Sequence, residues 1–264
     1  MPLHLNSITN DSQNSELLAW LFDHELQNAE LAFASEDKKY IHLTRFINDN
    51  KNGERIGKFV FTLMNDEKAK SLNILDLDIV IDSTHPVPLH FLNRLEPSSD
   101  ANEYYEVEAI GEGQHLEIET VNRHRISGSI VETTRDVYTS AFPFSLEIYD
   151  DIKAFNKSAG FTNQIRIGDT EYTASGYSES FAAVGGMFGA KNGETFSFLL
   201  GKVISFRDVC VQLGAHTLNF VIVQLQTALG ELPTAMSREV FDLDNLSVGK
   251  VVAMKADIKV DFAK

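Results

Sequence analysis

The chain has 264 residues, of which 43% are hydrophobic and 23% charged, and its formal net charge at pH 7 is −15. This balance is typical of globular proteins and excludes disordered, collagen-like and coiled-coil chains. A single cysteine excludes a disulfide framework. The excess of negative charge repels phosphate backbones, so nucleic acid is not expected as a partner.

The sequence favours a cytoplasmic protein without membrane contact. Residues 1–10 contain neither a basic start nor an apolar run, as a secretory signal would require. The longest weakly polar run, 181–190, is half the length of a membrane span. A lone cysteine fits a reducing compartment.

The negative charge is concentrated in the first part of the chain. Residues 1–150 carry 26 acidic and 12 basic side chains, a net charge of −14, whereas residues 151–264 carry 12 and 11, a net charge of −1. Such asymmetry is typical of two units with different surfaces. We therefore predict an acidic domain of one helix and an antiparallel sheet over 1–155, and an OB-like β-barrel domain over 156–264.

A long helix is predicted near the N-terminus. Ser15 is placed to cap it, and Glu16 lies in its first turn. Apolar residues then recur at three- and four-residue spacing, which predicts a helix with one buried stripe. These residues are Leu17, Leu18, Leu21, Phe22, Leu26, Ala29 and Phe33.

After Tyr40 the hydrophobic period changes from helical spacing to two, which predicts strands and a mainly β (α+β) fold. Asn50 to Gly53 are predicted to form a turn. The segment 75–82 alternates so cleanly that its aspartates are expected on a face in water. A polar loop is predicted over 98–102. The remaining strands are predicted at 58–64, 104–110, 115–121, 126–132, 142–149, 163–167, 170–174, 196–209, 218–227, 231–235 and 251–262.

The last third of the chain resembles an OB fold. Gly201 to Phe206 begin one long strand, 218–232 form a second, and 246–252 look like the turn into a closing strand. The segment 180–264 also resembles an uncharacterised bacterial family in which such a barrel follows an acidic β-rich part. This resemblance implies a binding module for single strands or sugars. The phenylalanines of the segment are nevertheless expected in the core.

Two predicted strands around a turn at 111–114 bring several carboxylates together. In this register Glu108 lies opposite Glu117, Glu106 lies opposite Glu119, and His115 shares their face. Like charges in facing positions destabilise a sheet, so the pattern needs an explanation. Three remain open: a solvated face, a docking surface for a basic protein, and a site for a hard cation.

A second group of carboxylates, Asp76, Asp78 and Asp82, is a weak candidate for a metal site. The D-x-D spacing places the first two on one strand face, where they can hold a divalent ion. Alternation with polar residues facing water explains the same pattern without a metal.

Motifs for nucleophilic catalysis, phosphate binding, dinucleotide binding and zinc proteases are absent from the sequence, so we expect no cofactor and assign no catalytic residue. The leading hypothesis is a non-catalytic binding or accessory protein whose acidic N-terminal face docks a basic protein. The alternatives are a metal-assisted hydrolase or carbohydrate-active enzyme that uses the N-terminal carboxylates, and a nucleic-acid binder that uses the C-terminal barrel.

Overall fold

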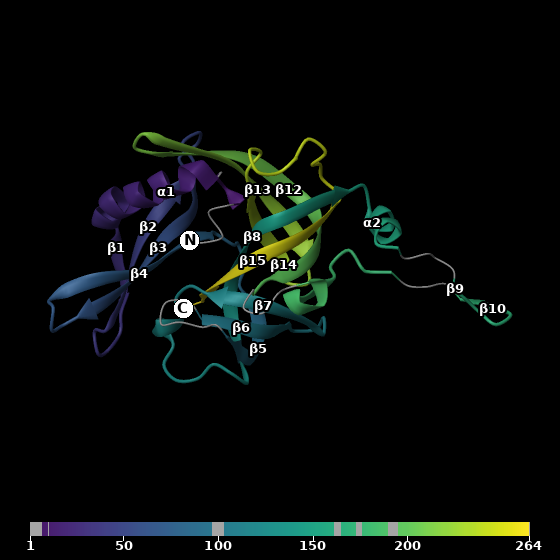
Figure 1. Ribbon diagram of the computed structural model, residues 1–264, viewed down its shortest axis with the longest axis horizontal. Helices are drawn as coiled ribbons and strands as arrows, with labels where there is room; N and C mark the ends of the chain where they lie inside the picture. The colour runs from purple at the N-terminus through teal and green to yellow at the C-terminus, as the bar shows by residue number, and fades with distance from the viewer. Residues whose placement is uncertain are drawn as a thin grey trace.

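The computed structural model describes residues 7–9, 11–96, 103–160, 165–172, 176–189 and 195–263. The fold is mainly β, with a helix near the N-terminus, which confirms the predicted fold class. Figure 1 shows this helix and a small sheet on one side of a larger assembly of strands. None of the helices in these ranges is long and apolar enough to cross a membrane.

The N-terminal helical segment begins and ends about five residues earlier than predicted. It consists of α1 (Asp11–Trp20), one π-helical turn, η2 (Leu21–Glu25), and a 3-10 turn, η3 (Leu26–Asn28). Leu17 and Leu21 are buried, as the apolar stripe predicts. Phe33, however, lies in a strand, β1 (Glu30–Ala34), that pairs with the next strand, and Ser15 lies within α1 instead of capping it. Pairing with a neighbouring strand overrides local helical spacing at Phe33.

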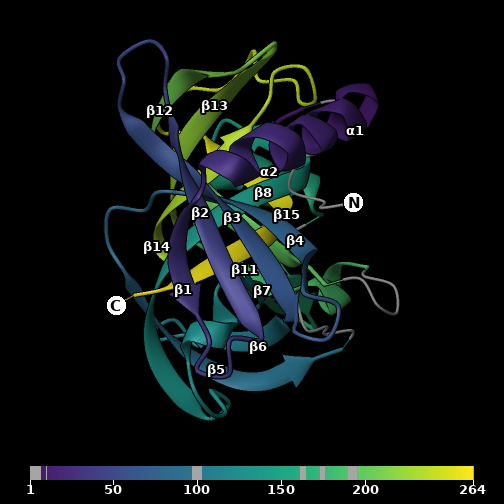
Figure 2. The same cartoon turned by 90° about the vertical axis from the view of Figure 1, so that its left-hand side faces the viewer.

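A four-stranded antiparallel sheet follows, in the order β1-β2-β3-β4. The turn after β2 contains Gly53 at a φ of 73°, which confirms the turn predicted there. One face of the sheet packs against the N-terminal helical segment and the far ends of β12 and β13, as Figure 2 shows. The bounds are β2 (Tyr40–Asn48), β3 (Arg55–Asp66) and β4 (Ser71–Ile81).

The larger sheet has nine strands and contains two closed rings that share β8 and β15. One ring runs β12-β13-β14-β8-β15 and closes through a β15–β12 pairing; the other runs β8-β15-β7-β6-β5 and closes through a β5–β8 pairing. The bounds are β5 (Val87–Leu95), β6 (Glu103–Ala109), β7 (Gln114–Thr120), β8 (Thr133–Tyr149), β11 (Ala182–Val184), β12 (Ser197–Leu213), β13 (His216–Thr227), β14 (Gly230–Met236) and β15 (Val251–Phe262).

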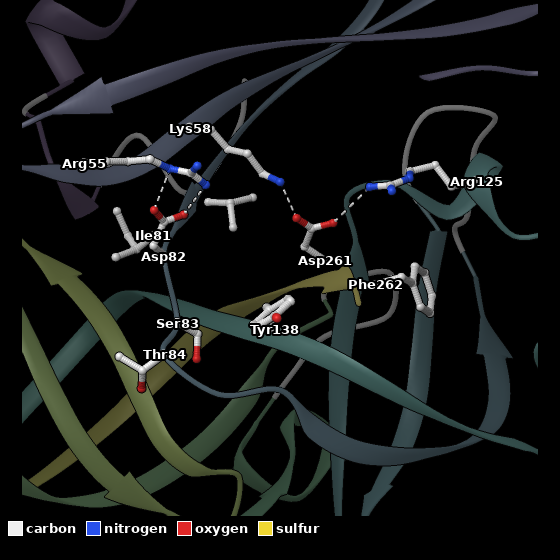
Figure 3. Close-up of a pocket in the computed structure, with 11 residues that line it drawn as sticks. Arg55, Lys58, Ile81, Asp82, Ser83, Thr84, Arg125, Tyr138, Asp261 and Phe262 are labelled. Atoms are coloured by element: carbon white, nitrogen blue, oxygen red, sulfur yellow. Dashed lines mark hydrogen bonds and ion pairs between the residues drawn. The ribbon is translucent and has the colours of Figure 1, made fainter. Parts of the chain in front are cut away.

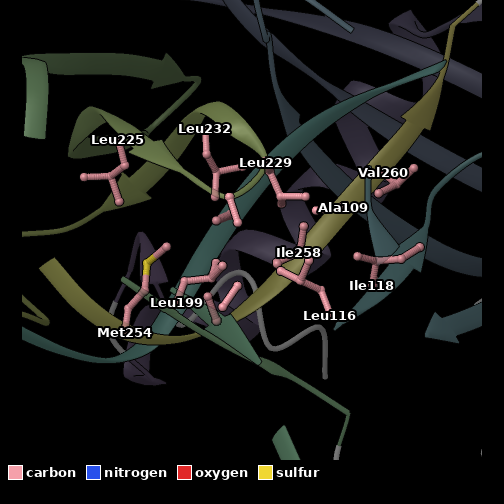
Figure 4. Close-up of a cluster of buried hydrophobic side chains, with 14 of the residues drawn as sticks. Ala109, Leu116, Ile118, Leu199, Leu225, Leu229, Leu232, Met254, Ile258 and Val260 are labelled. Carbon is pink, nitrogen blue, oxygen red and sulfur yellow. The ribbon is translucent and has the colours of Figure 1, made fainter. Parts of the chain in front are cut away.

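Strands from both sides of the predicted boundary at residue 155 pair with one another. β8 precedes that boundary, yet it pairs with β15 along most of its length and with β14 at Thr234. Both rings surround one core that includes Leu116, Leu225 and Ile258 (Figure 4). The OB-like barrel was predicted to lie wholly within 156–264. In the structure, the ring formed by β12, β13, β14 and β15 is completed by β8, which precedes residue 156.

Short elements connect the strands. They are η4 (Arg123–Arg125), α2 (Ile152–Ser158), η5 (Gly185–Phe188), and a two-stranded sheet of β9 (Ile165–Ile167) and β10 (Thr170–Tyr172). The strand predicted at 126–132 is absent, because this described segment follows η4 as turns and irregular chain. The loop predicted at 98–102 lies outside the described residues.

Candidate functional site

Three charged side chains in the second half of β15 are buried, although alternation would place them in water. Asp257, Lys259 and Asp261 share one face of this strand, opposite the core residues Ile258 and Val260. Lys259 is only 2% exposed, Asp261 7% and Asp257 8%. β4 and β7 supply the side chains that meet Lys259 on this face.

Lys259 lies at the centre of a cluster of carboxyl groups from three strands. Its ammonium group donates to Asp78 Oδ1 at 2.8 Å and to Glu119 Oε2, and it lies 3.5 Å from Asp257 Oδ2. One ligand atom from each of Asp76, Asp78 and Glu119 lies within 4.8 Å of the others, the spacing of a possible metal site. The ammonium group supplies the positive charge that such carboxylates would otherwise take from a metal ion.

Burial changes the proton affinities in this cluster. Loss of hydration is the largest effect on Asp78; attraction to Lys259 offsets only part of it, and the pKa of Asp78 is raised to about 7. Burial likewise raises the pKa of Glu119. For Lys259, burial favours the neutral amine, but the carboxylates of Asp257, Asp78 and Glu119 raise its pKa well above the usual value. The lysine therefore stays charged at neutral pH.

The buried carboxylates of Asp78 and Glu119 have a structural role: through Lys259 they hold strands of the two sheets together. Asp78 is 1% exposed and Glu119 2% exposed, so neither can contact a docked protein in this structure. They link β4 to β7 and β15 and so fasten the four-stranded sheet to the larger one. The predicted water-facing side of β4 is therefore wrong at Asp78, because β15 and β7 cover it. Asp82 lies apart from the cluster and forms an ion pair with Arg55, with 2.8 Å between Nε and Oδ2.

The predicted register of the carboxylate hairpin is wrong by two residues. The structure pairs Glu106 with Glu117 and Glu108 with His115, whereas Glu119 lies opposite Tyr104. β6 ends at Ala109 and β7 begins at Gln114, so the turn is shifted by one residue, with Gly111 and Gly113 at positive φ. A one-residue shift in a hairpin turn changes the paired positions by two.

The glutamates of the hairpin nevertheless share one face with His115, as alternation predicts. His115 Nδ1 lies 2.8 Å from Glu106 Oε1, and Asn93 Nδ2 donates to Glu106 Oε2 at 3.1 Å. Glu117 accepts a hydrogen bond from the backbone N–H of Phe196 at 2.9 Å, and burial raises the pKa of Glu117. Within the described part of the chain, the carboxylate of Glu108 has no hydrogen-bond or ion-pair partner.

Sequence reasoning missed Lys259. Its signal is the alternation of opposite charges at Lys255, Asp257, Lys259 and Asp261, at every second position of a strand whose other residues are apolar. Opposite charges at every second residue can neutralise one another on one face, so that face can be buried with its charges paired.

Comparison of the chain with protein-family models, with curated protein sequences and with solved structures found no match. The resemblance to an uncharacterised bacterial family therefore stays a prediction, and the function must be argued from the geometry of the chain itself.

Proposed function

We propose that the chain is a non-catalytic binding protein that docks a basic protein through the exposed part of the β6–β7 hairpin. The docking surface consists of Glu106, Glu108 and His115, together with Glu112 in the turn. Glu119 and Glu117, which the sequence analysis grouped with them, are excluded from it because Glu119 is buried and Glu117 is held by the backbone of Phe196.

The direct pairing of Glu106 with Glu117 carries this proposal. Two carboxylates in facing positions weaken a strand pair, and proteins retain such conflicts chiefly at functional sites. In the part of the chain that the structure describes, His115 and Asn93 are the side chains that relieve the repulsion at Glu106. The unpaired carboxylate of Glu108 and the exposed Glu112 then add negative charge at the same end of the hairpin. A partner with lysine or arginine side chains would neutralise this charge.

The chain's net charge of −15 supports the same class of partner, because long-range attraction speeds the encounter of oppositely charged proteins. The carboxylates required by the alternative, a metal-assisted hydrolase, are those that Lys259 already neutralises. A binding function therefore fits the accessible groups better than catalysis does.

Charge reversal tests the proposal. The double variant Glu108→Lys/Glu112→Lys alters two side chains without a described partner, so the fold should be preserved. Tagged wild-type protein should capture a basic protein that mass spectrometry identifies, and the variant should lose it. Capture should also weaken as salt rises.

The matched control is Glu36→Lys/Glu67→Lys, which makes the same change of charge at two exposed positions elsewhere. It should retain the partner. Equal capture by both double variants would contradict docking at the hairpin, and so would capture of no basic protein by the wild type.

A further inference from the structure

A polar cleft lies between the four-stranded sheet and the ends of β8 and β15. Its volume is about 440 Å³, within the range of small-molecule sites. Figure 3 shows Arg55, Lys58 and Arg125 spread across one side of it, with Asp82 beside Arg55 and Asp261 between Lys58 and Arg125. A second hollow of about 350 Å³ is lined by the same three cationic side chains and by Asp261.

Positive charge exceeds negative charge in this cleft, in contrast to the rest of the molecule. Among the described lining residues are three basic side chains, Arg55, Lys58 and Arg125, and the two carboxylates of Asp82 and Asp261. In the second hollow the same cations meet Asp261, the one acidic side chain among the described residues of its lining. The chain as a whole carries −15, so this local excess of cations is a departure from its general character.

Arg125 has unused hydrogen-bonding capacity. Its nearest acidic partner is Asp261, with 4.0 Å between Nη1 and Oδ1, which is too long for a hydrogen bond. Among the described residues its guanidinium group has no other ion-pair or hydrogen-bond partner. Its side chain is 26% exposed and therefore reachable from the cleft. A guanidinium group offers five N–H donors in a planar fork.

The other two cations are anchored but retain donors. Arg55 donates from Nη2 to Asp82 Oδ1 at 3.1 Å, and its guanidinium carbon lies 4.0 Å from the centre of the Phe46 ring. Lys58 donates to Asp261, which leaves two N–H groups of its ammonium without a described acceptor. Anchored cations pre-organise a site because they lose little freedom when a ligand binds.

His42 lines the second hollow and adds a neutral polar group. It is 2% exposed, and neither of its ring nitrogens has a hydrogen-bond partner among the described residues. Burial, followed by repulsion from His124 and Arg125, lowers its pKa to about 4, so the ring is neutral at pH 7. A neutral imidazole offers one donor and one acceptor, and leaving both unused in the interior costs free energy.

We propose that the second hollow, which His42 lines and which shares Lys58 and Arg125 with the cleft, binds a small molecule with an oxyanion group, a phosphate or a carboxylate, held by Arg125 and Lys58. Arginine pairs with both kinds of oxyanion through two parallel hydrogen bonds. The site is separate from the acidic hairpin and takes a ligand of opposite charge, so it does not depend on the proposed docking of a basic protein.

Thermal unfolding of the full chain tests this site with inorganic phosphate and with succinate, each compared with chloride at equal ionic strength. At ten times the dissociation constant, a ligand that binds only the folded state should raise the Tm by about 4 °C. A response to phosphate alone, or to succinate alone, identifies the oxyanion that the site prefers.

Variants then locate the site by calorimetric titration with the anion that responds. Arg125→Gln should weaken binding at least about tenfold, since it removes charge-assisted hydrogen bonds, and His42→Phe should weaken it about threefold. The matched control is Arg135→Gln, which removes an exposed arginine of β8 outside the lining and should bind as the wild type does.

Two results would overturn the proposal. One is a Tm that rises no further with phosphate or succinate than with chloride. The other concerns the affinity for the anion. If Arg125→Gln leaves it unchanged, the anion binds elsewhere. If Arg135→Gln lowers it as much as Arg125→Gln does, the binding reflects only general charge attraction.

Discussion

Replacing Lys259 with methionine should destabilise the protein more than any exposed charge substitution. Methionine keeps most of the length of the side chain but removes the ammonium group that contacts Asp78 and Glu119. These carboxyl groups are almost completely buried, so water cannot replace the lost partner. Breaking a buried pair in this way costs about 3–5 kcal/mol of unfolding free energy.

The size of this loss can be set against the whole stability of a folded domain, which is about 5–15 kcal/mol. Urea unfolding followed by circular dichroism measures it directly. The matched control is Lys202→Met, because Lys202 pairs with Glu179 at 3.2 Å but both side chains are more than 40% exposed. That exposed pair should contribute less than about 1 kcal/mol.

The Lys259→Met variant should also respond strongly to pH. Asp78 and Glu119 lose their cation, so the folded state must take up protons to neutralise them. Each proton bound only by the folded state raises the unfolding free energy by about 1.4 kcal/mol for every unit that the pH falls. Stability should therefore recover in acid, down to the pH at which the unfolded carboxylates also bind protons.

A triple variant separates charge from shape. Lys259→Met/Asp78→Asn/Glu119→Gln removes the cation together with two of the carboxylates, and it should regain more than half of the stability that the single variant loses. The reasoning is refuted if Lys259→Met unfolds within about 1 kcal/mol of the wild type, since a buried cation then contributes no more than an exposed one.

Three further predictions concern pH, a close backbone contact and a surface ion pair. The pKa of Asp78 is about 7 in the folded state and 3.8, its ordinary value, in the unfolded chain. The stabilising effect of its protonation is therefore complete below pH 3.8 and is lost as the pH rises through 7. The pKa of His42 falls from 6.5 to about 4, so its effect is complete above pH 6.5 and is lost as the pH falls through 4. These two effects on the unfolding free energy oppose each other between pH 4 and 6.5. In urea unfolding, as the pH falls from 7 to 5.5, His42→Phe should therefore gain stability relative to the wild type, and Asp78→Asn should lose stability relative to it. Gly57→Ala should lower the unfolding free energy by about 2 kcal/mol or more in the same assay, because the new Cβ would lie 2.2 Å from the Val80 carbonyl oxygen. The control Gly186→Ala has open space around the new Cβ and should change the unfolding free energy little. Glu54→Gln should shift the unfolding free energy by less than about 1 kcal/mol, since its ion pair with Arg207 is exposed; a larger loss would mean that this contact is shielded from water.

The sequence predicts much of the secondary structure because local periodicity reflects which side chains face the core. The strand predicted at 251–262 has the same bounds as β15, and the turn around Gly53 is where the pattern places it. The segment 126–132 is predicted wrongly, since its side chains suit a strand but no neighbouring strand pairs with it in the structure. Pairing is a property of the whole sheet, and periodicity in one segment contains no information about it.

The candidate sites were less predictable from the sequence than the secondary structure, because their residues come together only in the tertiary structure. Alternation correctly placed Glu106, Glu108 and His115 on one face of the hairpin, but the register followed from the position of the turn. The cleft beside Arg125 joins residues from the four-stranded sheet with residues near the end of the chain, and no sequence motif links them.

By itself the sequence determined the β-rich class, the faces of individual strands and the excess of acidic residues, because these depend on neighbouring positions and on composition. Only the tertiary structure decided that both faces are covered in the second half of β4, residues 77–81, and along most of β15. In a strand where aspartates alternate with apolar residues, the sequence alone predicts that the aspartates face water. Asp78 is nevertheless buried against Lys259. The two residues lie far apart in sequence, and a charge can be buried wherever folding brings its partner to it.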